Sequence, residues 1–481
     1  MKKPKFKFIY SISVVALLSS CNVPKVMHVQ QIKKLPEEIQ VNSKDLKGKY
    51  SRITLEQWFK DPDLNSLFNK VTQANPDFQI ARERVDMANS LLRRSKTALL
   101  PTLELGALIS ADHYGKYTME GVGNFDTNLS SNIGEDQRIS TDITPNYWIG
   151  GRSTWEIDAW GKLKNKKLSA QKKFLASGEG LRLLQIDLIT DTANLYYQLI
   201  ALDKRLKIYQ ENFKLQQRAF EIIKAQREVG KVTELAVQQF KAQNNNWLAE
   251  IEHIKVEIIT VQQALATLTG EYGGEIKRGT DLLPTNFEIL NKEIDVTQVI
   301  HSRPDVASNY FTLEASHADA RAARAAFYPK IDLSATFGLN SFSAETLFKP
   351  ASLAGQLLGG LMVPVLNRGK IKYEFNIANS QQEIAFLNYQ KSVTSAFNEL
   401  QSVLKQTKIY HKVLELKTEE VQFLDRGIEV SNDLYITGYA NYLELINSQR
   451  SKLQAELDLL QFRHQNTQNN ILLFKALGGS A

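Results

Sequence analysis

Side chains that could perform catalysis are present in this 481-residue chain, but their spacing forms no recognisable active site. The seven histidines show no metal-ligand spacing, and the sequence contains no HExxH, Walker, GxSxG or dinucleotide-binding motif. The single cysteine, Cys21, can form neither a disulfide within the chain nor a paired-thiol metal site. We therefore expect no enzyme, no bound metal and no cofactor, and Cys21 is the residue whose chemistry needs an explanation.

Cys21 follows a segment with the composition of an export signal. Residues 1–20 begin with lysines, continue with an apolar stretch and end in two serines. The end of this segment, Leu18-Ser19-Ser20-Cys21, resembles a bacterial lipobox, in which the cysteine becomes the lipid-modified first residue of the mature protein. The alternative is a chance cysteine after an apolar run. We expect residues 1–20 to be a lipoprotein signal peptide and Cys21 to be a lipid anchor.

The formal net charge of +7 depends largely on the start of the chain. Removing the four lysines of residues 1–20 leaves 55 basic (59 − 4) and 52 acidic residues, a net charge of +3. The remaining charges of both signs are mixed, and no basic stripe with interleaved aromatic residues is present, so we expect no nucleic-acid partner. After residue 20 no run of 18 apolar residues occurs, and the sequence predicts no transmembrane helix.

An internal repeat organises the rest of the chain. The motif Pro76-Asp77 recurs 228 residues later as Pro304-Asp305, and Gly230 recurs 208 residues later as Gly438. Further pairs at the same two offsets are Pro101 with Pro329, Gly161-Lys162 with Gly369-Lys370, and Gly270 with Gly478. The sequence therefore contains two copies of one unit, which differ by a length change of 20 residues after Pro101 in the first copy and after Pro329 in the second.

Within the windows that differ in length, apolar and polar residues alternate, which predicts β-strands. The alternation covers Leu103 to Ala111 and Ile331 to Leu339, and returning strands are expected at Tyr147 to Asp158 and Leu353 to Leu366. Polar loops, at about Asp112 to Asn146 and Phe342 to Pro350, connect the strands of each pair. Strands of about ten residues suit a tilted bilayer crossing, although a half-buried soluble sheet would show the same alternation. The polar positions expected to line a channel are Glu104, Arg152, Glu156, Asp332 and Asn340.

From Leu163 onward the apolar period becomes helical, with a heptad seam. A single helix over residues 162–228 would be about 100 Å long. It would reverse at Gly230 and return toward Gly270, and the second copy repeats this pattern around Gly438. Each copy therefore predicts a β-hairpin followed by a long antiparallel helical hairpin.

Two β-hairpins supply four strands, fewer than the roughly eight of the smallest closed transmembrane barrel. Open sheet edges are not tolerated in lipid, so several copies of the chain would have to share one barrel. Their helical hairpins would then assemble side by side into a second, water-filled tube.

Several motifs, in order, resemble the outer-membrane efflux proteins of the TolC/OprM type (the outer membrane factor family), especially their NodT-like lipoprotein branch. The longest runs from Arg303-Pro304-Asp305 to Pro329-Lys330-Ile331, and Trp155-Glu156-Ile157-Asp158 and Tyr442-Leu443-Glu444-Leu445 agree with it. The resemblance implies an α+β membrane protein, a homotrimer with a 12-stranded β-barrel continued by a 12-helix α-barrel. Each chain would be a tandem repeat of a β-hairpin and a long antiparallel helical hairpin.

This organisation predicts a series of segments along the chain. They are the signal peptide 1–20, an N-terminal linker and equatorial segment 21–74, repeat 1 at 75–270, an equatorial linker 271–302, repeat 2 at 303–478 and the C-terminal end 479–481.

The resemblance also implies a function and partners. The chain would be the outer-membrane channel subunit of a tripartite efflux system, passively conducting small molecules from the periplasm to the exterior. Its partners would be a periplasmic adaptor (membrane fusion protein), an inner-membrane pump of the resistance-nodulation-division type, and outer-membrane lipid. Two alternatives stay open: the conduit of a type I protein secretion system, and a non-pore periplasmic scaffold or adaptor lipoprotein. Adaptors usually have one helical hairpin, however, whereas this sequence predicts two.

In such channels adaptors dock at the helix tips, which here are Val229-Gly230-Lys231 and Thr437-Gly438-Tyr439. By spacing, Tyr435 matches a tyrosine that helps hold the tunnel tip closed, while Glu444 and Asn447 fall where two aspartates can stand. Three copies of Glu444 near a three-fold axis would form an acidic ring that favours cations. The alternative is that Glu444 is a solvated helix residue.

Overall fold

The computed structural model describes residues 24–26, 54–284, 295–364 and 368–479. The expected signal peptide and Cys21 lie outside the described residues. The chain folds as two compact units, and the boundary between them falls inside four helices. Of the described residues, the sheet unit includes 88–174, 312–364 and 368–386, and the hairpin unit includes 54–87, 175–284, 295–311 and 387–479. Each unit therefore draws residues from both copies of the repeat.

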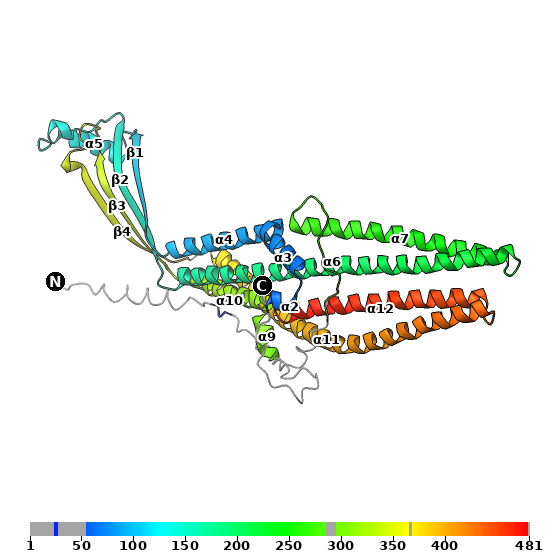
Figure 1. Cartoon of the computed structure of the whole chain (residues 1–481). Helices are drawn as coiled ribbons and strands as arrows, with labels where there is room; N and C mark the ends of the chain where they lie inside the picture. Colours follow the sequence, from blue (N-terminus) through cyan, green and yellow to red (C-terminus); the bar gives the residue numbers. More distant parts are fainter. Residues whose placement is uncertain (1–23, 27–53, 285–294, 365–367, 480–481) are drawn as a thin grey trace. The chain divides into compact units, whose positions relative to one another are not determined.

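The helices and strands are labelled in Figure 1, where colour follows the sequence. The helices are α2 Leu55–Trp58, α3 Pro62–Ala74, α4 Pro76–Thr97, α5 Met119–Leu129, α6 Lys162–Glu228, α7 Glu234–Thr269, α9 Val296–Ser302, α10 Pro304–Ala325, α11 Arg368–Thr437 and α12 Tyr442–Ala476. The strands are β1 Thr102–Asp112, β2 Thr144–Ile157, β3 Lys330–Ser341 and β4 Leu353–Met362. Short 3₁₀ helices lie at Glu135–Gln137 and Pro350–Ser352.

The elements occur twice, at the two offsets read from the sequence. Adding 228 to the bounds of α4 gives those of α10, and adding 208 to the bounds of α7 gives those of α12 to within one residue. The helix expected over residues 162–228 is present as α6, and its counterpart is α11. Among the described residues, no helix carries an apolar stretch long enough to cross a membrane.

The four strands form one antiparallel sheet in the order β1-β2-β3-β4. The strand predictions are confirmed at these four places, except that β4 ends at Met362; its expected end, Leu366, lies outside the described residues. The two hairpins join through β2 and β3, where Gly150 lies opposite Gly338. A Cβ atom added to Gly150 would lie 2.2 Å from the carbonyl oxygen of Phe337, so the close approach of these strands requires glycine.

The connection between β1 and β2 differs from the plain loop that was expected. Residues 119–129 form the helix α5, and Thr118 caps its start because its hydroxyl accepts a hydrogen bond from the amide of Gly121 at 3.0 Å. The apolar residues Met119, Val122 and Phe125 recur at helical spacing in this segment. The expectation of a loop was wrong because the many Asn, Asp and Gly residues of the segment masked that short apolar pattern.

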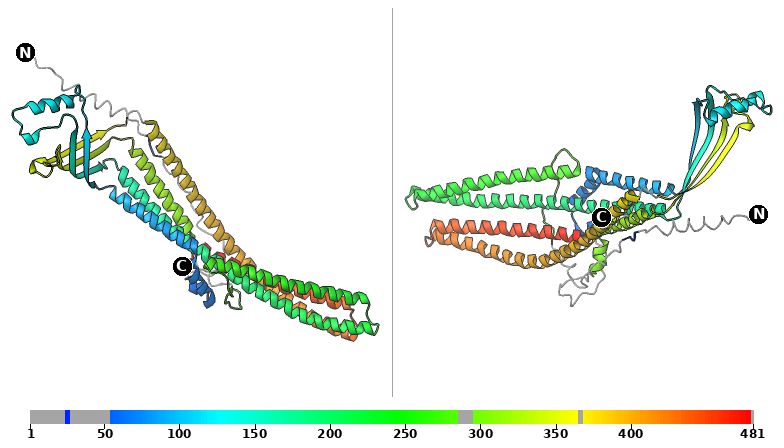
Figure 2. Two further views of the ribbon diagram at one scale, coloured as in Figure 1. Left: turned by 90° about the horizontal axis from the view of Figure 1, so that it is seen from above. Right: turned by 180° about the vertical axis from the view of Figure 1, so that it is seen from behind.

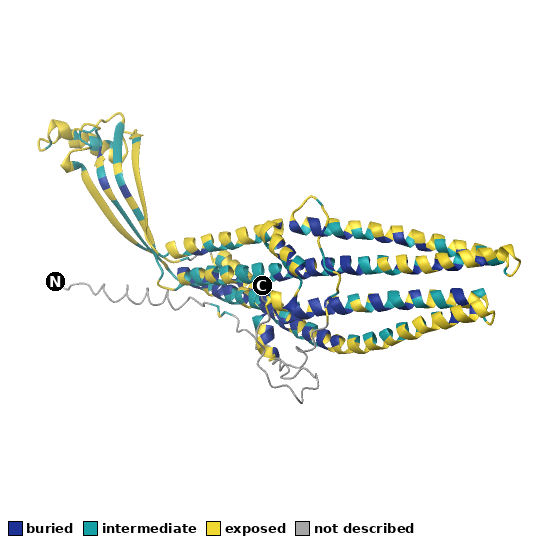
Figure 3. Ribbon diagram, in the orientation of Figure 1, coloured by how far each residue is buried: buried dark blue, intermediate teal, exposed yellow. Residues whose placement is uncertain are grey.

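In the hairpin unit the long helices lie side by side in the order α7, α6, α12, α11 (Figures 1 and 2). Ion pairs link neighbours in this order: Arg205 of α6 with Glu257 of α7 at 3.1 Å, and Lys417 of α11 with Asp458 of α12 at 3.2 Å. Buried residues concentrate where α2 and α3 meet the end of α12 (Figure 3), and there the ring of Phe59 packs edge-on against Phe474 at a centroid distance of 5.3 Å. This aromatic cluster anchors the N-terminal helices to the hairpins.

Candidate channel lining and gate

The register of the sheet separates two faces with different chemistry. Side chains of paired residues in an antiparallel sheet point to the same side, so the register assigns each residue to a face. The row Leu105, Gly151, Phe337 and Gly355 belongs to the apolar face. The large exposed residues of this face include Leu103, Leu105, Ile109, Phe337, Leu353, Leu357 and Leu361. An apolar surface of this extent, open to solvent in the isolated chain, must be covered by another hydrophobic phase or partner.

The opposite face carries the polar residues expected to line a channel, together with the exposed apolar residues Leu108, Leu358 and Met362. Glu104 pairs with Arg152, Glu156 pairs with Asp332, and Asn340 pairs with Trp148. All five predicted lining residues therefore share this face. Its lower end, where the strands meet the helices, is charged: Lys162 Nζ lies 2.8 Å from Glu156 Oε1, and Lys330 Nζ lies 2.8 Å from Asp332 Oδ1. The two lysines offset the repulsion that opposed carboxylates would otherwise create.

Aromatic residues flank the apolar face at both ends. Tyr147 and Trp155 lie eight residues apart on this face of β2, about 27 Å along an antiparallel strand. The indole of Trp155 donates a hydrogen bond to the carbonyl of Leu99 at 3.1 Å, and the ring of Trp160 stacks on that of Tyr328 at 5.0 Å. Rings with one apolar side and one hydrogen-bonding atom are typical of the two membrane–water interfaces.

Both predicted helix tips are tight reversals that end at glycine. The backbone φ angle is +73° at Gly230 and +81° at Gly438, a conformation that other L-residues rarely adopt. At the first tip the amide of Lys231 donates to the carbonyl of Gln226 at 2.8 Å, and at the second the amide of Tyr439 donates to the carbonyl of Leu434 at 2.8 Å. These bonds are the Schellman arrangement of helix C-termini.

The tips expose side chains of similar character. Val229 is 70% exposed and Tyr439 is 86% exposed, while Lys231 and Thr437 are also on the surface. Each tip therefore presents an apolar group beside polar ones, a composition suited to contact with a partner protein.

Tyr435 joins the two helical hairpins just above the tips. Its hydroxyl donates a hydrogen bond to the side-chain oxygen of Gln226 on α6, and only 8% of Tyr435 is exposed. Its ring packs in a cluster with Ile223, Phe240 and Leu445, residues from three other helices. Burial raises the pKa of the Tyr435 phenol, so that the hydroxyl is a donor at neutral pH. The sequence pattern placed Tyr435 at a closing link but did not identify Gln226, since the two are 209 residues apart.

Glu444 has a local structural task that the sequence pattern did not predict. It is the third residue of α12, and its carboxylate accepts a hydrogen bond from the backbone amide of Asn441 at 3.0 Å. In return the side chain of Asn441 accepts from the amide of Glu444 at 3.1 Å, which completes a capping box. Glu444 and Asn447 are both exposed in the isolated chain, three residues apart on one helix. The carboxylate of Glu444 therefore caps a helix and still faces solvent.

A second polar link between the hairpins lies several turns from the tips. Asn212 of α6 donates to Glu456 of α12 at 2.8 Å, and Glu456 also lies 3.7 Å from Lys452. Burial disfavours the charged form of Lys452, but its ion pairs with Asp425 and Glu456 outweigh burial and raise its pKa. No sequence motif marks these residues, because each is an ordinary polar position of a long helix.

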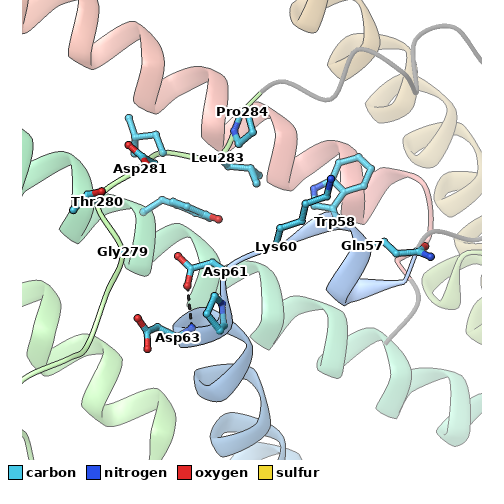
Figure 4. A pocket seen from close by; sticks show the side chains of 13 residues that line it. Gln57, Trp58, Lys60, Asp61, Asp63, Gly279, Thr280, Asp281, Leu283 and Pro284 are labelled. Atoms are coloured by element: carbon cyan, nitrogen blue, oxygen red, sulfur yellow. Dashed lines mark hydrogen bonds between the residues drawn. The ribbon is translucent and has the colours of Figure 1, made fainter.

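A cavity with a volume of about 760 Å³ lies in the hairpin unit, beside the start of α3 (Figure 4). One of its polar side chains, Asp61, helps to hold the chain together. Asp61 Oδ1 accepts a hydrogen bond from the amide of Asp63 at 2.9 Å, which caps α3, and Asp61 Oδ2 accepts from the hydroxyl of Tyr196 at 2.6 Å. The same hydroxyl accepts from the amide of Gly279 at 2.9 Å. The cavity therefore lies where three segments of the chain meet: the start of α3, helix α6 and the segment around Gly279.

Comparisons with known proteins agree over most of the chain. The family model described as outer membrane efflux protein matches residues 67–271 and 296–479. The probable outer membrane lipoprotein SilC of Salmonella typhimurium is 25% identical over 486 residues, covering 98% of each chain. The cation efflux system protein CusC of Escherichia coli K12 is 24% identical over 454 residues, covering 94% of each chain, and the solvent efflux pump outer membrane protein SrpC of Pseudomonas putida is 27% identical over 432 residues, covering 88% of this chain and 87% of its own.

Solved structures have the same fold. The outer-membrane channel OprN superposes with a TM-score of 0.83 at 20% identity, covering 96% of this chain and 99% of its own. A crystal structure of CusC superposes with a TM-score of 0.79 at 22% identity, covering 95% of this chain and 99% of its own. Since the family model spans most of the chain and the folds agree throughout, the chain belongs to the outer membrane efflux protein family, whose members are outer-membrane channels of efflux systems and not enzymes.

Proposed function

We propose that three copies of this chain assemble into a channel that passively conducts small molecules from the periplasm to the exterior. In this assembly the four strands of each copy contribute to a 12-stranded barrel, and the helical hairpins continue it as a 12-helix tube. The energy would come from an inner-membrane pump of the resistance-nodulation-division type, through a periplasmic adaptor that contacts the tips at Val229–Lys231 and Thr437–Tyr439.

The observation that carries this proposal is the two-faced sheet with open edges. In the part of the chain that the structure describes, β1 and β4 each pair on one side only. Their free backbone groups would cost several kcal/mol each if left unpaired in lipid. Pairing β4 of one copy with β1 of the next satisfies both edges, turns the apolar faces toward lipid and gathers the polar faces around a lumen.

The relatives support a small cargo without naming one for this chain. CusC is named for cation efflux and SrpC for solvent efflux. Two cargoes so different in charge are compatible with one conduit architecture if selectivity belongs to the pump. A small-molecule cargo is therefore our proposal for this chain, ahead of protein secretion.

Lipid attachment at Cys21 is part of the same proposal. The resemblance to SilC, whose name includes the word lipoprotein, supports it. Labelling cells with a radioactive fatty acid tests the anchor: the wild-type chain should incorporate label and a Cys21→Ser variant should not. Equal labelling of both chains would refute acylation at Cys21.

The channel itself is tested by two substitutions at neighbouring positions of β4. Leu357 belongs to the apolar face and Gln356 to the polar face. An arginine at a lipid-facing position costs about 2–4 kcal/mol at the bilayer centre, whereas a lumen position accepts it. We expect Leu357→Arg to reduce the amount of trimer in the outer membrane, and Gln356→Arg to leave assembly intact while shifting the single-channel selectivity toward anions. Equal assembly of the two variants, or a purified protein that is monomeric and does not conduct, would show that the proposed pore is wrong.

A further inference from the structure

Helix α5, in the connection between β1 and β2, is oriented with its apolar side outward. Figure 3 shows it exposed over most of its surface. Met119 is 88% exposed, Val122 48%, Phe125 58% and Leu129 71%. Spacings of three and four residues place these side chains on one stripe of the helix. A surface helix normally buries such a stripe, so this orientation needs an explanation.

The polar side of α5 is fixed to its own connection, which prevents the helix from rotating. Asn128 makes two hydrogen bonds with Ile139: its amide group donates to the carbonyl at 2.7 Å, and its side-chain oxygen accepts from the backbone amide at 2.8 Å. One turn earlier, the amide group of Asn124 donates to the hydroxyl of Thr144 at 3.1 Å. These asparagines lie four residues apart and hold the same face of the helix against residues 139–144. The apolar stripe is consequently held away from its own chain.

Two surfaces could cover the stripe, a lipid surface or another copy of the chain. Helices that lie on lipid are rich in Lys and Arg, which attract anionic headgroups. Helix α5 contains neither, and the whole connection 112–146 has six acidic and two basic residues. Asp126 lies on the same side of the helix as Met119 and Val122, and inserting its carboxylate among acyl chains would be costly. The charges therefore favour a protein surface.

We propose that α5 is an assembly contact, whose apolar stripe packs against the β1–β2 connection of an adjacent copy. This inference rests on the proposed channel, in which neighbouring copies join through β1 and β4. Lys116 and Arg138 of the connection make no ion pair within the described residues. In the assembly, these two side chains of one copy are therefore available to pair with Asp126 of the next. Such contacts tie the connections of the three copies together at the end of the barrel distant from the helices.

The test uses cysteine substitution in the full-length protein. Phe125→Cys places a thiol on the stripe, and the matched control Thr127→Cys places one on an exposed position of the same helix outside the stripe. Intact cells are treated with a membrane-impermeant maleimide, and the wild-type chain reports any background from Cys21. In parallel, a short bis-maleimide is applied to a double variant, Phe125→Cys with Arg138→Cys, and the products are separated on a denaturing gel.

If α5 is an assembly contact, the thiol of the Phe125→Cys variant is labelled about tenfold more slowly than that of the control, because the contact must open first. The double variant then yields cross-linked dimers and trimers, since the two thiols of neighbouring copies face one another. Equal labelling of the two single variants overturns the inference, and so does protection without any cross-link between chains, which indicates lipid.

The trimer mass and the conductance of the same samples are measured separately, so that the two proposals can fail independently. A conducting trimer with a freely labelled stripe would refute only the role of α5. A non-conducting monomer would refute the channel itself.

Discussion

The guanidinium of Arg303 and the carboxylate of Glu399 form a partly buried ion pair, with Nη2 2.6 Å from Oε2. Only 5% of the Arg303 side chain is exposed, and Asp305 binds the same guanidinium at 3.0 Å. Arg303 Nη1 also donates to the carbonyl of Ala476, which fastens the start of α10 to α11 and to the end of α12. Burial opposes the charged form of Arg303, but the two carboxylates outweigh it and raise its pKa.

In the first copy of the repeat, a neutral residue makes the equivalent hydrogen bond. Asn75 stands 228 residues before Arg303, and its side chain donates to the carbonyl of Leu268 at 3.0 Å. Leu268 stands 208 residues before Ala476, so the two bonds are equivalent in the repeat. At the position equivalent to Glu399 the first copy has Asp191, whose pKa is raised by burial and by the nearby Asp187. Both copies therefore have a hydrogen bond to the end of the helix that follows the tip, α7 in the first copy and α12 in the second. The charges around the two bonds differ.

Removing one partner of this pair should destabilise the hairpin unit. Glu399→Gln leaves the buried guanidinium with Asp305 as its remaining carboxylate partner, and losing a charged hydrogen-bond partner costs about 1.5–3 kcal/mol. We expect a clearly lower unfolding temperature for the purified protein, measured by circular dichroism. Glu419→Gln, at an exposed position of the same helix, is the control and should leave it unchanged. Indistinguishable unfolding temperatures of the two variants would contradict the role assigned to the pair.

Substituting a tip glycine should loosen the helix reversal. A Cβ atom at Gly438, whose φ is +81°, costs about 1 kcal/mol in the left-handed region. Gly427 lies inside α11 with no atom within 4 Å of an added Cβ, so that Gly427→Ala should instead stabilise the helix. We expect faster hydrogen exchange of the tip amides in Gly438→Ala and slower exchange around residue 427 in the control. The same direction of change in both variants would count against the backbone argument.

The link between Tyr435 and Gln226 should restrain the tunnel tip. Tyr435→Phe removes the hydroxyl and keeps the packing of the ring, so we expect a larger mean conductance in planar bilayers. Gln226→Leu should act in the same direction, and the double variant should add little, because both changes break one hydrogen bond. Tyr439→Phe, at an exposed tip position, is the matched control. Wild-type conductance in both single variants would remove the link from the closing mechanism.

The two tasks of Glu444 can be separated by choice of substitution. Glutamine still accepts a hydrogen bond at the third helix position, so Glu444→Gln keeps the capping box and removes the charge. Glu444→Ala removes both and should cost about 1 kcal/mol of helix stability. If three Glu444 carboxylates form an acidic ring, both variants lose cation preference in bilayer recordings, and only the alanine variant also loses stability. Unchanged selectivity in Glu444→Gln would leave capping as its only role.

Acidification should destabilise the hairpin unit through His464. This residue lines a cavity of about 390 Å³ with Arg205, Tyr209 and Glu257, and burial lowers its pKa. As the pH falls through about 6.5, the unfolded chain binds a proton before the folded chain does, so stability is lost until the lower folded pKa is reached. We expect the unfolding temperature to drop between about pH 7.5 and 5, and His464→Gln to reduce that drop. His301→Gln, at a surface position, is the control and should leave the drop unchanged. If the drop is also unchanged in the His464 variant, His464 is not its cause.

Local sequence patterns were enough to predict most elements of this fold. Alternation of apolar and polar residues is a property of each strand, and the heptad seam is a property of each helix, so both could be read without knowing any contact. The glycines at 230 and 438 marked the reversals for the same reason, because a positive φ is a local requirement. Helix α5 was equally local, but its apolar stripe is short and lies in a polar segment.

The sequence by itself therefore determined the repeat, the strands, the long helical hairpins and the tips. Only the tertiary structure decided which side chains meet: Gln226 with Tyr435, Glu399 with Arg303, and the side of α5 that faces outward. The physical reason is that these contacts join residues far apart in the chain, or depend on which face of an element is held by hydrogen bonds. Side-chain spacing along one helix carries no information about the partner on another.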